Sequence, residues 1–95
     1  MSKKKTKLPN KFRLVMIEWE DSRIPISKWR YVDPEERYRP VSCVSVGWLL
    51  RDEKRVKVLV QNIGDLKEPE NGQISGVMQI SSRAVTKITD LKTVS

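Results

Sequence analysis

Apolar residues alternate with smaller or polar ones over residues 43–50, the most regular pattern in the chain. The even positions carry the larger side chains, and the first three odd positions are Cys43, Ser45 and Gly47. A period of two predicts a β-strand whose two faces have different surroundings. We therefore expect Val44, Val46 and Trp48 to face the core.

A second strand is predicted over residues 56–60, after the polar turn 51–54. Val56, Val58 and Val60 are expected inside, and the intervening Lys57 and Leu59 outside. Two alternating segments joined by a short polar turn predict a β-hairpin. This hairpin forms the middle of the expected fold.

Three further strands are predicted from β-branched and aromatic residues. Residues 12–19 are apolar on both faces, which favours a central or barrel strand. Residues 73–80 follow a connection in which 62–65 is predicted as a turn and Asn71-Gly72 marks a tight turn. Residues 81–84 predict a single 3₁₀ turn capped by a serine hydroxyl, before the last strand at 85–91.

The connection over residues 20–41 is unusually long, with three prolines and dense charges of both signs. Asp33 followed by Pro34 permits a short helical turn, with Asp as the N-cap. Loops longer than about 12–15 residues in compact domains are usually functional or disordered. This segment is therefore the first place to look for a function.

The predicted fold class is mainly β, a small five-stranded, partly open barrel of the SH3 or Sm kind. Closure hides strand edges that an open five-stranded sheet would expose. The alternative is a β-sandwich-like roll with a helix at 33–39 plugging one end. The expected organisation is a disordered basic arm at 1–11, one domain at 12–91 and a frayed tail at 92–95.

The segments 17–22, 43–50 and 76–85 carry a resemblance to a known group of sequences. Over residues 14–91 the chain resembles small, functionally uncharacterised proteins encoded in phage and prophage regions of bacterial genomes. The resemblance implies a bacterial or phage-infected cytosol and supplies no catalytic residues. A strand, a single turn and a strand at the end of the fold are similar to many binding modules, which favours binding over catalysis.

The charge is concentrated at one end of the 95-residue chain, whose 19 Lys and Arg outnumber 12 Asp and Glu. Residues 1–13 hold six basic residues and no acidic one, whereas the other residues have a net charge of +1. The basic residues are Lys3, Lys4, Lys5, Lys7, Lys11 and Arg13. This arm is expected either to contact phosphates of nucleic acid or only to solubilise the protein.

The chain has no histidine, which excludes Ser-His-Asp and Cys-His catalysis and histidine metal ligands. Its single Cys43 is expected to pack in the interior. The carboxylate pairs 35–36 and 52–53 have neighbours that point apart on an extended chain, as expected of solvated turns. We therefore predict no enzymatic activity, no metal site and no cofactor.

Aromatic and basic residues are interleaved in the long connection. This composition suits protein interfaces, where Trp, Tyr and Arg are common anchors, and also single-stranded nucleic acid. A third interpretation folds Trp29 and Tyr31 back as a lid over the core. The predicted partner-binding residues are Trp29, Arg30, Tyr31, Arg37, Tyr38 and Arg39.

The predicted function is a non-enzymatic interaction module in the cytoplasm. It binds a protein partner or a second copy through residues 22–40 or a strand edge. The alternative is a nucleic-acid-binding protein that uses the basic arm together with Trp29, Tyr31 and Tyr38. No apolar run approaches the ~20 residues of a membrane helix, so no membrane association is expected.

Overall fold

The alternating segments form the strands of a computed structural model that describes residues 12–92. The described chain is mainly β and contains no α-helix among these residues. Its elements are β1 (Arg13–Asp21), β2 (Val41–Asp52), β3 (Val56–Val60), β4 (Asn62–Gly64), η1 (Pro69–Asn71), β5 (Gln73–Ser75), β6 (Met78–Ser81), η2 (Ser82–Ala84) and β7 (Val85–Asp90). The predicted arm at 1–11, and residues 93–95 of the predicted tail, lie outside the described residues.

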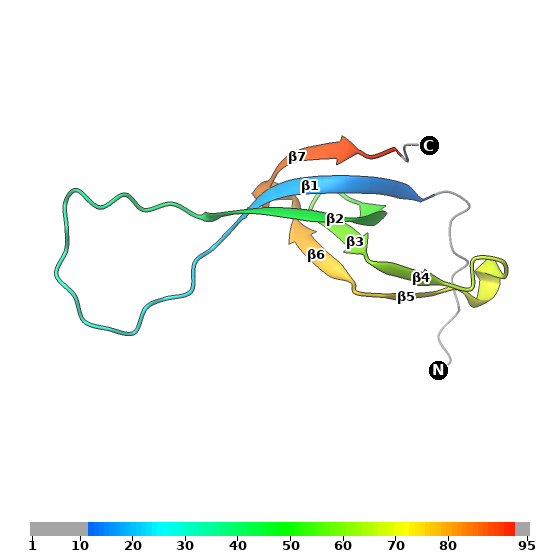
Figure 1. The fold of residues 1–95 in the computed structure, drawn as a ribbon, viewed down its shortest axis with the longest axis horizontal. Helices are drawn as coiled ribbons and strands as arrows, with labels where there is room; N and C mark the ends of the chain where they lie inside the picture. The colour runs from blue at the N-terminus through cyan, green and yellow to red at the C-terminus, as the bar shows by residue number, and fades with distance from the viewer. Residues whose placement is uncertain (1–11, 93–95) are drawn as a thin grey trace.

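The strands form a five-stranded antiparallel sheet and a small two-stranded one (Figure 1). The order in the larger sheet is β6-β3-β2-β1-β7, so β2 is the central strand and β1 lies between β2 and the edge strand β7. Strands β4 and β5 form the second sheet. Within residues 12–92 no pairing joins β6 to β7, so the larger sheet is not closed into a barrel.

The core lies on one face of the larger sheet. Directly opposed residues on antiparallel strands share a face, which brings together one or two apolar side chains from each of four strands. The buried cluster is Val15, Ile17, Leu49, Leu59 and Ile80. Trp19, Val85 and Ile88 pack against this cluster, and the Trp19 Nε1 donates to Ser45 Oγ at 3.0 Å.

The predicted core face of β2 is wrong. Val44 and Val46 are 62% and 50% exposed, Trp48 is half-buried, and Leu49 faces the core instead. The reason is spatial: Gly47 lies opposite the buried Val15, and a Cβ on Gly47 would lie 2.9 Å from the Val60 carbonyl oxygen. The core face of β2 therefore needs small side chains at this close approach of β3.

The predicted faces of β3 need a similar correction. Leu59, expected outside, is buried in the core opposite Leu49. Val60 is buried as expected, but it pairs with Trp48 and does not belong to the core cluster. Val56 and Val58 are only half-buried. The hairpin itself is confirmed, and its register shifts between Leu49 and Arg51.

The single strand predicted at 73–80 is divided in two at Gly76. Gly76 has a φ of +68°, and a Cβ there would lie 2.9 Å from Gln61 Cβ. Such a backbone favours glycine. Before this point β5 pairs with β4 in the second sheet, and after it β6 joins the larger sheet. The turn predicted at 62–65 is therefore mostly strand.

The 3₁₀ turn before the last strand is confirmed as η2, but its predicted serine cap is wrong. Ser81 at the N-cap makes no side-chain capping bond. The Ser82 hydroxyl instead donates to the Glu53 carbonyl at 3.0 Å, and the Ser82 amide donates to the Arg55 carbonyl at 2.9 Å. These bonds attach η2 to the β2–β3 turn.

The helix expected within the long connection does not form. Asp33 begins only a turn, in which the Glu36 amide donates to the Asp33 carbonyl at 3.1 Å and the Glu35 amide donates to the Asp33 carboxylate at 2.9 Å. Every residue of 33–39 is exposed. The alternative fold with a helix plugging one end is therefore wrong.

Candidate functional site in the 22–40 loop

The loop of residues 22–40 projects from one end of the β1–β2 ladder (Figure 1). The ladder stops where Asp21 pairs with Val41. Proline has no amide hydrogen to donate, so Pro25, Pro34 and Pro40 disfavour continued strand pairing. All residues of this loop are exposed. The loop thus extends away from the core without packing on the sheet.

The aromatic residues at the far part of the loop are fully open to solvent. Trp29 is 102% exposed and Tyr31 is 98% exposed, so the interpretation of these residues as a lid over the core is wrong. Ile24, Ile26 and Val32 are also exposed. Large exposed apolar side chains are thus concentrated in this one segment, and such concentrations are typical of interaction surfaces.

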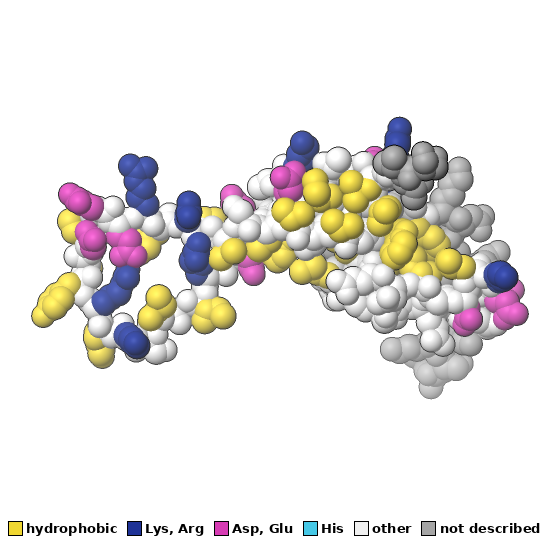
Figure 2. All heavy atoms as spheres, viewed as in Figure 1, with side chains coloured by type: hydrophobic (Ala, Val, Ile, Leu, Met, Phe, Trp, Pro, Cys, Tyr) yellow, Lys and Arg dark blue, Asp and Glu magenta, His cyan; other side chains and the backbone are white. Residues whose placement is uncertain are grey.

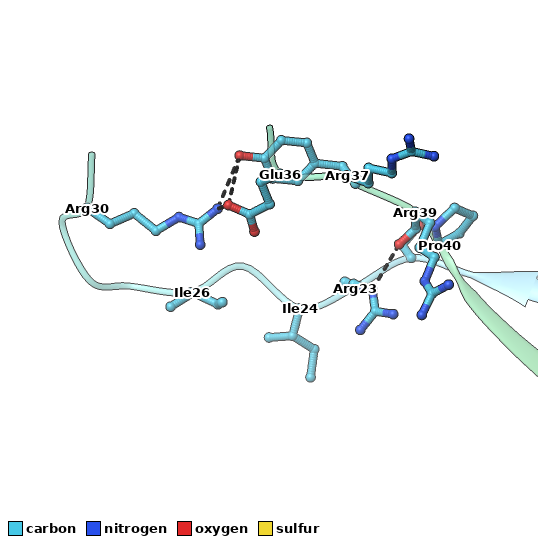
Figure 3. A pocket seen from close by; sticks show the side chains of 10 residues that line it. Arg23, Ile24, Ile26, Arg30, Glu36, Arg37, Arg39 and Pro40 are labelled. Atoms are coloured by element: carbon cyan, nitrogen blue, oxygen red, sulfur yellow. Dashed lines mark hydrogen bonds and ion pairs between the residues drawn. The ribbon is translucent and has the colours of Figure 1, made fainter. Parts of the chain in front are cut away.

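Arg30 braces the loop across its width (Figure 3). Its Nη2 lies 2.6 Å from Glu36 Oε2 and donates to the Tyr38 hydroxyl at 3.1 Å. The guanidinium carbon stands 5.9 Å from the centroid of the Tyr38 ring. The hydrogen bond to Glu36 raises the pKa of Arg30 above its usual value. These contacts connect the two arms of the loop.

A second contact joins the two arms near the sheet, where Arg23 Nε donates to the Arg39 carbonyl at 2.8 Å. Between the two contacts the loop surrounds an open space of about 930 Å³, and Figure 2 shows it as an opening through the loop. The lining residues are Ser22, Arg23, Ile24, Ile26, Arg30, Glu36, Arg37, Tyr38, Arg39 and Pro40.

The lining has a positive charge with apolar groups beside it. Four arginines and one glutamate contribute to it, and Arg30 is the partner of that glutamate. Within residues 12–92, Arg23, Arg37 and Arg39 form no ion pair. These three arginines lie toward the end of the loop that joins the sheet, a region that we call the neck. Figure 3 shows the Arg37 side chain pointing to the opposite side from those of Arg23 and Arg39.

The predicted partner-binding residues all lie on the loop but divide into three groups. Arg30 and Tyr38 brace it, Arg37 and Arg39 belong to the neck, and Trp29 and Tyr31 lie outside the lining. Arg23, Ile24, Ile26 and Glu36 also line the space but were not among the predicted binding residues. Arg30 and Glu36 are six positions apart, whereas neighbouring side chains on a helix are three or four apart, so no local spacing rule predicts their contact.

The residues proposed for nucleic acid are described only in part, because Lys3, Lys4, Lys5, Lys7 and Lys11 lie outside the described residues. Arg13 is described, and its Nη2 lies 3.0 Å from Asp90 Oδ1. Its Nη1 lies 3.6 Å from Asp52 Oδ2. Arg13 therefore already has carboxylate partners and acts in the sheet.

The remaining candidate groups have structural partners. The Lys57 ammonium lies 2.5 Å from Asp52 Oδ1 and lowers the pKa of that carboxyl. The Cys43 thiol is half-buried and lies 3.5 Å from the Val41 carbonyl, to which it donates. Both groups thus contribute local contacts within the sheet.

Comparison of the chain with models of protein families, with curated proteins and with solved structures finds no match. Within residues 12–92, no helix is long and apolar enough to cross a membrane. A functional assignment therefore depends on the geometry of the loop. The described residues thus form a small, mainly β protein with a large exposed loop.

Proposed function

We propose that this protein is a non-enzymatic interaction module that binds a protein partner or a second copy through the 22–40 loop. The observation that supports this most strongly is the full exposure of Trp29 and Tyr31 on a projecting loop. Trp, Tyr and Arg are the residues most often found at the energetic centre of protein interfaces. Val44 and Val46 on β2 are exposed apolar residues as well.

We also propose that the larger sheet is an open relative of the SH3/Sm-like barrel. The long connection between β1 and β2, the strand order and the 3₁₀ turn before β7 support this proposal. Phage or prophage origin and a bacterial cytosol remain predictions from the sequence.

Alanine substitution tests the role of the aromatic residues in binding. A tagged Trp29→Ala/Tyr31→Ala variant should lose binding to itself or to a protein captured from bacterial lysate, measured by light scattering and pull-down. Each interface hot spot contributes about 2 kcal/mol or more, so affinity should fall at least roughly thirtyfold. Val77→Ala removes an exposed apolar group outside the loop and should leave binding unchanged.

The stability of the aromatic variant separates a binding defect from a folding defect. Both side chains are fully exposed, so the urea midpoint should not move. Equal binding by the wild type and the aromatic variant would contradict the proposal. So would a strictly monomeric wild type that captures nothing.

Nucleic-acid binding is the second candidate function, favoured by the position of exposed Trp29 between Lys28 and Arg30. Bases stack on aromatic rings while cations contact phosphates. This function predicts binding to a labelled single-stranded oligonucleotide at about 50 mM salt, weakening steeply as salt rises. Deletion of residues 1–11 should weaken binding further. No binding at low salt would exclude this candidate.

A further inference from the structure

Among residues 12–92, the two ends of the molecule differ in charge. The 22–40 loop is at one end of the longest axis, and the turn between β4 and β5 is at the other (Figure 1). The molecule extends 59 Å along this axis. Residues 65–70, which we call the tip, include three acidic residues and one lysine, and Figure 2 shows acidic side chains at this end.

The tip carries carboxylates, whereas the neck carries guanidinium groups. Asp65, Glu68 and Glu70 are exposed, and within residues 12–92 none of them forms an ion pair. Leu66 stands among them with its side chain exposed. The tip therefore offers carboxylates beside an apolar group, whereas the neck offers guanidinium groups beside Ile24 and Ile26.

The tip contains two turns that are closed by backbone hydrogen bonds. Asp65 adopts a φ of +57°, the Glu68 amide donates to the Asp65 carbonyl at 3.0 Å, and the Asn71 amide donates to the Glu68 carbonyl at 2.9 Å. A segment ordered by its own turns loses less entropy on docking than a free tail. The space inside the loop is within the ~300–1,000 Å³ of ordinary ligand pockets, enough for a few side chains.

We propose that the tip of a second copy of this chain docks at the neck of the 22–40 loop, so that copies associate head to tail. The inference rests on the proposed function, because it names the partner of the same loop. A contact between two different surfaces leaves one neck and one tip free on every pair. Such heterologous contacts continue into rings or filaments unless the geometry closes them.

The lining favours a protein occupant over nucleic acid. Its apolar members Ile24, Ile26 and Pro40 are aliphatic or cyclic, and stacking of bases needs flat rings. Tyr38 is the one aromatic residue of the lining, and the guanidinium of Arg30 stands near its ring. An acidic protein segment with an apolar side chain matches both parts of this surface.

Charge reversal tests the head-to-tail contact. Light scattering should show wild-type mass rising with concentration at about 50 mM salt and falling at about 500 mM, where the Debye length is short. The neck variant Arg37→Glu/Arg39→Glu and the tip variant Glu68→Lys/Glu70→Lys should each associate more than about tenfold more weakly. The chain that carries all four substitutions should regain association.

A matched control changes the net charge elsewhere. Arg83→Glu/Lys87→Glu alters the charge as much as the neck variant does, at exposed positions on η2 and β7, and should associate like the wild type. A mixture of neck and tip variants should also form hetero-assemblies, because each supplies a surface complementary to the other.

Several outcomes would overturn the inference. A wild type that is monomeric at all concentrations would do so, even if its neck binds a synthetic acidic peptide or an oligonucleotide. A tip variant that associates like the wild type would also do so. If the tip variant behaves normally while Trp29→Ala/Tyr31→Ala loses binding, the head-to-tail contact fails and the proposed function stands. Unchanged association in the tip variant and in the aromatic variant would contradict the head-to-tail contact and the proposed function together.

Discussion

The sheet and the 22–40 loop use similar side chains in opposite ways. Ile17 in β1 is completely buried, whereas Ile24, only seven positions further along the chain, is 88% exposed. Burial of an isoleucine side chain stabilises a fold by about 1.5–3 kcal/mol, and an exposed one contributes nothing of that kind. The sheet therefore provides the stability, and the apolar surface of the loop remains available for a partner.

The largest expected difference between the two regions is in truncation of matched isoleucines. Ile17→Ala should lower the free energy of unfolding by about 2–5 kcal/mol, because it leaves a cavity in the core. Ile24→Ala should change it by less than about 0.5 kcal/mol. Urea denaturation measures both. A comparable loss for Ile24→Ala would show that the loop packs on the body in solution.

Two strand glycines provide a smaller contrast within the body itself. Gly47→Ala would place a Cβ 2.9 Å from the Val60 carbonyl oxygen, and Gly64→Ala would meet its nearest atom, the Gln73 carbonyl oxygen, at 3.8 Å. The first should cost about 1–3 kcal/mol through overpacking, and the second less than about 0.5 kcal/mol. Thermal unfolding compares them, and equal melting temperatures would contradict the close approach of β2 to β3.

The smallest expected effect concerns ion pairs. The pKa of Asp52 is lowered in the folded protein by Lys57, so the pair stabilises the fold above the unfolded pKa of about 3.9. This stabilisation is lost as the pH falls through the lowered folded value. Because Asp52 is exposed, it amounts to no more than about 1 kcal/mol.

Acid titration of stability measures this effect. The advantage of the wild type over Asp52→Asn should be present at pH 6 and disappear in stronger acid. Glu36→Gln, which removes the ion pair of the loop, should leave global stability unchanged at every pH. A larger loss for Glu36→Gln than for Asp52→Asn would reverse the assignment of stability to the body.

The sequence was informative about strands because period-two patterns and β-branched residues depend on local geometry. It failed on the faces of β2, since the identity of the core face depends on which residues lie opposite. Gly47 and Ser45 oppose Val15 and Ile17, and no pattern within β2 contains that information. The division at Gly76 likewise depends on the close approach of Gln61, which is distant in sequence and leaves no room for a Cβ at position 76.

The candidate site could be predicted in composition but not in arrangement. The interleaved aromatic and basic residues identified the loop, and the prolines and mixed charges indicated a long connection. The ion pair between Arg30 and Glu36, and the hydrogen bond from Arg23 to the Arg39 carbonyl at the neck, depend on contacts between the two arms of the loop. Such contacts follow from how the loop closes on itself, which no local spacing encodes.

The pairing of β1 with β7 has a consequence for synthesis on the ribosome. Val15 is among the first core residues to leave the exit tunnel, but its partner Asp90 emerges only 75 positions later. Until then one edge of β1 has no neighbour from β7, and the buried cluster lacks the cover of Val85 and Ile88. The nascent chain must therefore keep an apolar strand edge from aggregating until translation of this region is complete, when folding can finish.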